Sequence, residues 1–185
     1  IGGCEFPDVN ARVGNGIQFY GTVTNALVEN NHVEQIYDDG LTNQRDLSTD
    51  TYTIQCDWIN NIVDKCRCST NWFIRSVNST VKINIYNNTF SNAGQEWSAD
   101  QRPDSTFGAR HIRLAGITGT IDYFNIKNNI FYQADYSCFY SYAPLPAVSI
   151  DYNLYYNTEG DIGNIDNTNS YPTLAAWQAA TSQEV

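Results

Sequence analysis

A short pattern of apolar and polar positions recurs five times along the chain. In each copy, apolar residues alternate with polar ones up to an asparagine, and a second short apolar segment follows. Such alternation is typical of a strand with one buried face. Asparagine tolerates left-handed backbone angles, so it indicates a turn between the two strands. The five reference asparagines are Asn31, Asn61, Asn88, Asn129 and Asn153.

Four positions around each reference asparagine are apolar or small in nearly every copy. Two stand before the asparagine and two after it, as shown around Asn61 by Cys56, Trp58, Val63 and Cys66. Successive reference asparagines are 30, 27, 41 and 24 residues apart. Spacings of this size fit one turn of a parallel β-solenoid, with loops inserted in the longer turns.

Stacked coils would bring the five reference asparagines into register. Equivalent residues of neighbouring coils lie about 4.8 Å apart, so each side-chain amide would hydrogen-bond the next and form a ladder. The alternative is a set of unrelated asparagine-rich turns between hairpins. That arrangement would not require the same four apolar positions around every asparagine.

The two ends of the chain lead to different expectations. We expect coils over residues 1–158 and a capping segment with a short helix over residues 159–185. Pro172 precedes a helix-forming stretch in which Trp177 would cover the last coil. The N-terminal end shows no cap, so we expect further coils before residue 1, or another chain, to cover it. The chain contains no Met, which indicates a processed form or a piece of a longer protein.

Composition and charge narrow the possible partners. The 185 residues are enough for one domain with a sizeable core. A net charge of -10 argues against nucleic acid as a partner. The absence of a long apolar stretch argues against membrane insertion. The five cysteines are an odd number, so at least one is free or paired outside this chain.

The repeat resembles that of the pectate-lyase-like superfamily over roughly residues 13–158. Three segments are similar to those of secreted bacterial β-helix proteins: GIQFYG…VENNHVEQIYDDGL, NAGQEWSADQRPD…GARHIRL and IKNNIFYQAD. The resemblance implies an all-β, right-handed parallel β-helix of about five to six coils in an extracellular or cell-surface protein. The superfamily includes lyases, hydrolases, epimerases, adhesins and phage tailspikes, so the fold alone does not define the function.

The longest insertion, residues 95–114, lies between the third and fourth copies and carries three of the ten basic residues. Loops that project from a rigid solenoid are common places for sites. We expect an aromatic ring to stack on a sugar, arginines to pair with a carboxylate, and a histidine or aspartate to move a proton. The candidate catalytic residues here are Arg102, Asp104, Arg110 and His111, and the candidate substrate-binding residues are Trp97, Arg113 and Tyr136. The alternative is a structural loop held by internal Arg–Asp pairs.

The resemblance also implies a way in which a lyase would work. Polysaccharide lyases of this fold use an arginine or lysine base, with Ca²⁺ neutralising the uronate, and Arg102, Arg110 and Arg113 are placed for that role. An acidic surface repels a polyuronate unless cations screen it, which slightly favours a hydrolase or simple binding.

Residues 110–114 alternate like a strand, so Arg110 and either His111 or Arg113 should face opposite sides.

The adjacent acids Asp38 and Asp39 form a second candidate site. They resemble the acidic pair of polygalacturonase-type hydrolases, in which one carboxyl donates a proton and the other acts as base or nucleophile. The companion Gly-His-Gly and Arg-Ile-Lys motifs of those enzymes are absent from this sequence. Alternatively, the pair could bind Ca²⁺ together with Asp64 or Asp57 of the next coil. A third interpretation is a solvated turn with no function.

Tyrosines are numerous around the fourth and fifth copies. We expect them to be exposed and to form either a carbohydrate-stacking surface or a protein interface. The residues concerned are Tyr132, Tyr136, Tyr140, Tyr142, Tyr155 and Tyr156.

The sequence as a whole predicts an extracellular β-helix that binds a polysaccharide and, if it is an enzyme, cleaves it as a lyase or glycoside hydrolase. The alternative is a non-catalytic structural or adhesive solenoid of a surface filament or fibre. An enzyme should gather the candidate residues on one face. A structural module should scatter them and show large apolar interfaces to neighbouring chains.

Overall fold

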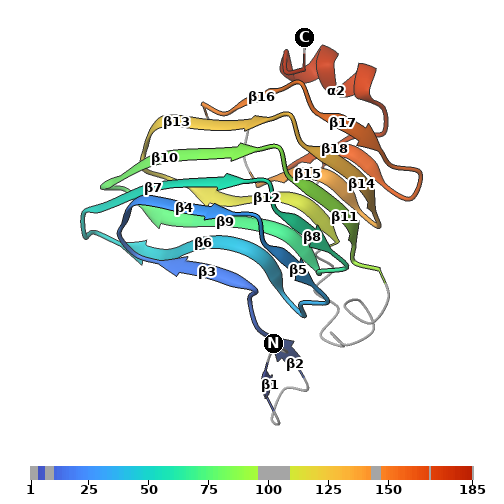
Figure 1. Cartoon of the computed structure of the whole chain (residues 1–185). Helices are drawn as coiled ribbons and strands as arrows, with labels where there is room; N and C mark the ends of the chain where they lie inside the picture. Colours follow the sequence, from blue (N-terminus) through green and yellow to red (C-terminus); the bar gives the residue numbers. More distant parts are fainter. Residues whose placement is uncertain (1–3, 7–10, 96–108, 143–146, 167, 185) are drawn as a thin grey trace.

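The computed structural model describes residues 4–6, 11–95, 109–142, 147–166 and 168–184. Most of them form strands that stack one above another, and the chain winds repeatedly through three sheets (Figure 1). Each coil adds one strand to sheet I, then one to sheet II and one to sheet III, before the chain returns to sheet I. The predicted all-β solenoid is therefore confirmed.

Sheet I has seven strands, and its neighbours are parallel except for the final antiparallel pair β18–β19. Its strands are β3 (Ile17–Tyr20), β6 (Asp39–Ser48), β9 (Cys68–Ser76), β12 (Arg110–Ile117), β15 (Ser137–Ser141), β18 (Asp161–Ile165) and β19 (Asn169–Tyr171).

Sheets II and III have five strands each, and every pair in them is parallel. Sheet II consists of β4 (Val23–Glu29), β7 (Tyr52–Ile59), β10 (Ser79–Tyr86), β13 (Thr120–Lys127) and β16 (Ser149–Asp151). Sheet III consists of β5 (His32–Glu34), β8 (Ile62–Asp64), β11 (Thr89–Ala93), β14 (Ile130–Ala134) and β17 (Leu154–Tyr156). A separate antiparallel pair, β1 (Cys4–Phe6) and β2 (Ala11–Val13), precedes the solenoid.

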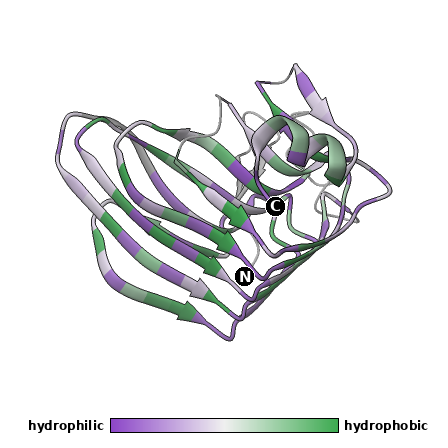
Figure 2. Cartoon of the chain, turned by 90° about the horizontal axis from the view of Figure 1, so that it is seen from above, coloured by the Kyte–Doolittle hydropathy of each residue, from purple (hydrophilic) through white to green (hydrophobic). Residues whose placement is uncertain are grey.

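The predicted apolar positions form the core between the sheets. Hydrophobic and hydrophilic residues alternate along the strands (Figure 2), and in β10 the burial alternates in the same way. The four positions predicted to be inward are buried in most coils, and an exposed residue, Thr158, departs from the pattern in the last one. Large rings meet edge to face from coil to coil, with the ring centres of Trp58 and Phe124 each 5.6 Å from that of Trp72. A column of core side chains therefore runs along the solenoid.

The predicted asparagine ladder is present. Asn31 Nδ2 donates to Asn61 Oδ1 at 3.0 Å, and the same bond joins each later reference asparagine to the next. In the three central coils the side chain is buried, so each of these bonds satisfies a polar group inside the protein.

The left-handed backbone angle of this turn lies one residue earlier than the sequence pattern indicated. It belongs to the residue before the ladder asparagine, with φ of 57° at Asn30 and 56° at Asn60. The same position is taken by Tyr152 in the last coil. The ladder asparagine itself follows the turn, and this leaves its side chain free to point inward and bond its neighbours.

The C-terminal segment covers the last coil. Helix α2 (Leu174–Thr181) begins after Pro172, and the hydroxyl of its N-cap, Thr173, accepts from the Ala176 backbone N–H. The Trp177 ring is fully buried and stacks on Phe139 at 5.4 Å. Figure 1 shows α2 lying over the C-terminal end of the stack. Strand β18 still pairs with β15, so the coils extend past residue 158 and the segment from 159 onward is not all cap.

Candidate functional site

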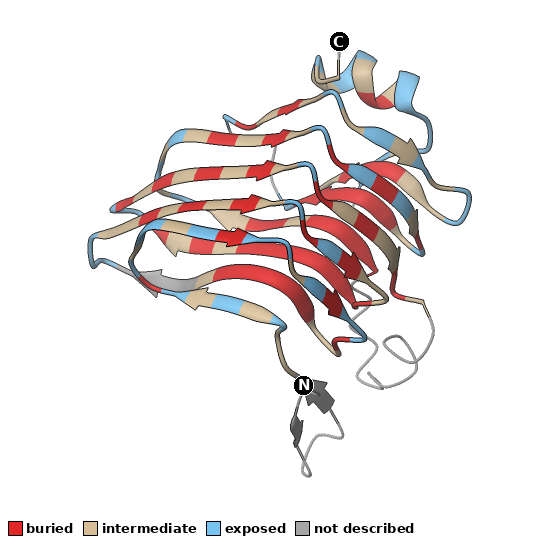
Figure 3. Ribbon diagram, viewed as in Figure 1, coloured by how far each residue is buried: buried red, intermediate tan, exposed pale blue. Residues whose placement is uncertain are grey.

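The outer face of sheet I gathers polar and aromatic side chains from successive coils. Leu41, Trp72 and Leu114 belong to the core, so residues next to them in the strands point to the opposite face. One such outward row, in register across the sheet, consists of Thr42, Asn71, Arg113, Tyr140 and Asn164. Several of these side chains are nevertheless buried, and burial in this sheet is more continuous than in sheet II (Figure 3). We call this surface the sheet I outer face.

An ion cluster lies at the start of this face. The guanidinium of Arg67 pairs with both Asp38 and Asp39, although the two acids are neighbours in sequence. They converge because Asp38 lies in the bend that precedes β6, whereas Asp39 begins the strand. Asp39 also accepts hydrogen bonds from Asn71 Nδ2 at 2.8 Å and from Gln44 Nε2 at 3.1 Å.

Burial raises the pKa of the Asp39 carboxyl. The side chain is almost fully buried, and this desolvation, together with the charge of Asp38, raises its pKa. Arg67 and Asn71 act in the opposite direction but do not cancel the shift. Asp39 is therefore more readily protonated than an ordinary aspartate, which is the property of a carboxyl that donates a proton.

Two arginines of β12 lie beside tyrosine rings on the same face. The Arg110 guanidinium is 4.4 Å from the Tyr136 ring centre and 4.0 Å from that of Tyr140. Arg113 donates to the Tyr142 hydroxyl at 2.8 Å. Burial of Arg110 lowers its pKa. The expectation that Tyr140 is exposed is wrong: it is 2% exposed, because Arg110 and the neighbouring tyrosines pack around it.

His111 lies inside the solenoid rather than on the outer face. Its Nδ1 is 2.9 Å from Ser69 Oγ, and its ring is 5.7 Å from that of Phe131. Desolvation lowers its pKa to about 3, so the imidazole is neutral at neutral pH. Arg110 and Arg113 thus share a face, while the intervening His111 points into the core.

The glycine after the two acids has a packing role. A Cβ on Gly40 would lie 2.5 Å from Val63 Cγ1 and 2.8 Å from the Ser69 carbonyl oxygen. Only glycine fits this close approach between coils. The Asp-Asp-Gly sequence therefore combines an outward ion cluster with an inward contact of the backbone.

The structure does not bring all the predicted residues together. Trp97, Arg102 and Asp104 fall outside the described residues. Asp64 lies in sheet III, where it accepts hydrogen bonds from Ser91 and Asn92 rather than facing the Asp38–Asp39 pair on sheet I. In the described part of the chain, no group of three or more His, Cys, Asp or Glu side chains is arranged to hold a metal ion. The Ca²⁺ site stays a prediction.

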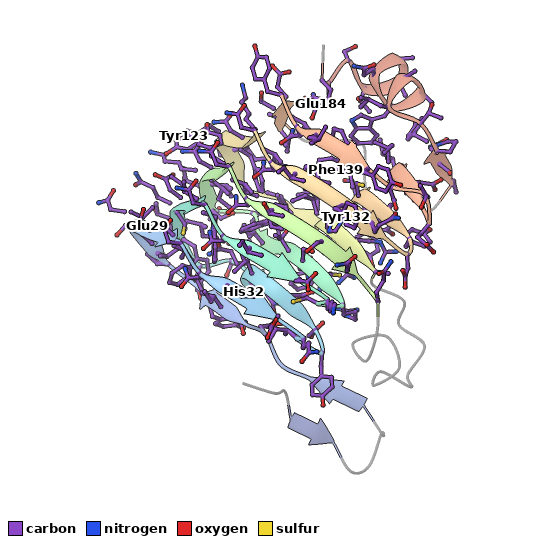
Figure 4. All side chains as sticks on the ribbon, turned by 45° about the vertical axis from the view of Figure 1, so that its right-hand side comes forward. Glu29, His32, Tyr123, Tyr132, Phe139 and Glu184 are labelled. Carbon is purple, nitrogen blue, oxygen red and sulfur yellow. The ribbon has the colours of Figure 1, made fainter. Side chains whose placement is uncertain are left out.

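The tyrosines expected at the surface divide between different environments. Tyr132 and Tyr156 lie side by side on sheet III, with stacked rings 5.3 Å apart, and about half of each side chain is exposed. Tyr155 is partly buried and stacks on Phe131 in the core. Figure 4 shows Tyr132 on the ribbon of β14. The tyrosines therefore do not form one continuous surface.

Arg67 and Asn71 are site residues that the sequence analysis missed. Asp39 pairs with Cys68, although it is three residues after the inward Ile36 whereas Cys68 is two after Cys66. This offset of one residue hides the alignment of Arg67 with the acids. Extending the repeat alignment past its last apolar position, with one gap, would have revealed it.

Two buried acceptors on the same face lack partners. Asn71 Oδ1 and Asn164 Oδ1 have no hydrogen-bond partner among the described residues, and each side chain is only 5% exposed. Unsatisfied buried acceptors are costly, so they mark positions where a bound hydroxyl or water would be stabilising.

Comparison with protein-family models, with curated proteins and with solved structures gave no match. In the described part of the chain, no helix is long and apolar enough to cross a membrane.

Proposed function

We propose that the protein is an extracellular right-handed β-helix that binds a polysaccharide on the sheet I outer face. The observation that carries the proposal is the row of arginine–tyrosine contacts, in which Arg110 lies against Tyr136 and Tyr140 and Arg113 bonds Tyr142. Tyr140 is buried behind these side chains, but the rings of Tyr136 and Tyr142 reach the surface and offer apolar surfaces to the C–H groups of sugars. The arginines offer several donors to hydroxyls or carboxylates. Right-handed winding is supported by the strong preference of parallel crossover connections for that hand.

The strand spacing of the sheet supports an extended ligand. Outward residues of neighbouring coils are about 4.8 Å apart, so Asn71, Arg113 and Asn164 lie in one row that crosses several strands. A linear polymer lying across the strands would meet one coil after another. The resemblance to pectate-lyase-like proteins supports the same class of ligand.

Cleavage is the more specific part of the proposal, and the site suggests two forms of it. A hydrolase would use Asp39, whose pKa is raised, as the proton donor, with Asp38 as the second carboxylate. A lyase would use Arg110, whose pKa is lowered by burial, as the base that removes a proton from the sugar. The two reactions leave different products, which makes them experimentally separable.

The test is a screen of the purified protein on pectin, alginate, xylan and glucan, with and without Ca²⁺. We expect retention on at least one glycan, and binding weakened about tenfold or more by Arg113→Ala, since hydrogen bonds to charged groups contribute about 1.5–3 kcal/mol. Ultraviolet-absorbing unsaturated products would identify a lyase, and new reducing ends alone a hydrolase. The matched control is Lys82→Ala, whose ammonium pairs with Asp122 at 3.3 Å on sheet II. Equal binding by both variants would refute the assigned face.

A non-catalytic structural solenoid is the second candidate function. It is favoured by an apolar patch on the outer face of sheet III, where Ile130 pairs in register with Leu154 and Tyr132 with Tyr156. All four side chains are between 42% and 63% exposed. Exposed apolar patches often mark protein interfaces. Failure to bind or cleave any glycan, together with filaments in electron micrographs, would favour this alternative.

A further inference from the structure

Successive coils are joined by one repeated set of contacts. Each ladder asparagine after the first donates from Nδ2 to a backbone carbonyl of the preceding coil, as Asn61 does to Val28 and Asn88 to Trp58. Its Oδ1 accepts from both the backbone N–H and the Nδ2 of the ladder asparagine one coil earlier, as Asn61 does from Asn31. The N-terminal side of every later coil is therefore filled by the coil before it.

The first coil presents the same surface without those contacts. Asn31 Nδ2 donates to Glu29 in its own coil, and no donor reaches Asn31 Oδ1 among the described residues. Strands β3, β4 and β5 are the terminal strands of their sheets, paired on one side with β6, β7 and β8. The antiparallel β1–β2 pair does not join these sheets.

The apolar interior is also incompletely covered at this end. Four hydrophobic residues of the first coil are packed against the core but are only partly buried: Ile17, Phe19, Val23 and Ala26. The first coil also has a pocket of about 220 Å³, which is lined by Gly16, His32, Val33, Glu34 and Ile36. Open strand edges next to exposed core residues are a template for another chain segment.

The C-terminal end is closed by its own chain. The Glu184 carboxylate accepts from both the backbone N–H and Nδ2 of Asn153, and so takes the place of a further ladder asparagine. The Gln183 side chain accepts from the Ile150 N–H, and Trp177 covers the core. Figure 4 shows Glu184 at this end of the stack and His32 at the opposite end.

We propose that the N-terminal end of the solenoid binds one further β-helical coil of the same repeat. Its strands add in parallel to β3, β4 and β5, its apolar residues cover Phe19 and Val23, and its ladder amide donates to Asn31 Oδ1. The occupant is a coil with an open C-terminal side. A second folded copy of this chain does not offer one, because α2 and Glu184 cover its last coil, and two N-terminal ends would oppose two acceptor oxygens.

The experiment supplies such a coil directly. A copy of residues 39–66, which contains one strand for each sheet, is placed immediately before Gly14 in place of residues 1–13. Hydrogen exchange of the first-coil amides is then compared with that of the unchanged chain. We expect exchange in Val23–Glu29 to slow by about tenfold or more and the melting temperature to rise, since a packed coil removes these amides from the fraying end.

Two controls make the result specific. In the first, the copies of Ile54 and Trp58 in the added coil are changed to Ser, which should abolish the protection while leaving the native part folded. In the second, the unchanged chain is examined by sedimentation at increasing concentration. We expect no dimer in which two copies associate through their N-terminal ends. Unaltered exchange in the extended chain would overturn the proposal. So would a concentration-dependent dimer that protects β4, because a second copy would then be the occupant.

Discussion

At the scale of single residues, burial sets the chemistry of the titratable groups. His111 is enclosed by Ser69 and the ring of Phe131, and desolvation lowers its pKa to about 3. Asp39 is equally enclosed, but beside Asp38 and Arg67, and its pKa is raised. Burial favours the neutral form in both cases, so His111 is a poor base and Asp39 keeps its proton to a higher pH than an ordinary aspartate.

His111 should make the folded chain sensitive to acid. Its pKa is lower in the folded than in the unfolded state, where it is near 6.5, so its contribution to stability is complete above pH 6.5 and is lost as the pH falls toward 3. The loss is about 1.4 kcal/mol per pH unit for one proton. Urea unfolding between pH 7 and pH 4 should therefore show a shallower pH dependence for His111→Asn than for the unchanged chain.

The second histidine provides the control for this measurement. The His32 side chain is 58% exposed at the surface of β5, so His32→Asn should retain the full pH dependence. Identical pH profiles for the unchanged chain and the His111 variant would contradict the account of a buried, neutral imidazole.

A ladder asparagine should contribute more to stability than an asparagine on the outside of a sheet. Asn88→Ala leaves the Trp58 carbonyl and the Asn61 N–H without their buried partner, and each such group costs about 1–3 kcal/mol. We expect a loss of about 3 kcal/mol in the free energy of unfolding. Asn84 is on the outside of sheet II, where its side chain bonds those of Asp57 and Asn125. Asn84→Ala should cost less than about 1 kcal/mol. Similar losses in the two variants would show that the asparagine ladder contributes no more to stability than an asparagine on the outside of a sheet.

At the scale of elements, the short helix α2 acts through one side chain. Trp177 stacks on Phe139 and fits against Gly163, where a Cβ would lie 2.1 Å from its ring. Most of the other side chains of the helix are at least partly exposed. The helix therefore serves to hold an indole over the open end of the core.

Removal of this side chain should destabilise the whole chain. Trp177→Ala is expected to lower the free energy of unfolding by about 3 kcal/mol, because large aromatic truncations in cores cost about 3–5 kcal/mol. Leu174→Ala in the same helix should cost less than about 1 kcal/mol, since its side chain is at the exposed end of α2. Guanidinium unfolding of both variants provides the comparison. Equal costs would mean that the helix stabilises the coil by some means other than the indole.

The same elements show what the sequence could predict and why. Strands of sheets II and III carry a local alternation that ends at a recurring asparagine, so the inward positions and the ladder followed from short segments. The helix was predicted from Pro172 and the residues after it. Sheet I lacks such a marker, and the pairing of Arg67 with the acids depends on a one-residue offset between coils. The side that His111 faces depends on how the chain enters sheet I from the preceding corner, which alternation alone does not fix.

At the scale of the whole molecule, stacking turns scattered residues into surfaces. Arg67 is far in the sequence from Arg110 and Arg113, yet strand pairing brings all three together at sheet I, in a chain of net charge -10. A patch of exposed apolar residues lies instead on sheet III, and the uncovered strand edges lie at the N-terminal end. The solenoid thus separates a polar face, an apolar face and an open end, and each has its own proposed partner.

The most direct test of the central claim is to map the bound glycan by nuclear magnetic resonance. An oligosaccharide of the glycan that the protein retains would be titrated into ¹⁵N-labelled protein. We predict that the amide signals of Cys68–Ser76, Arg110–Ile117 and Ser137–Ser141 shift together, while those of Ile130–Ala134 and Leu154–Tyr156 stay in place. Shifts confined to the strands of sheet III, or no shift with any glycan, would contradict a binding site on the sheet I outer face.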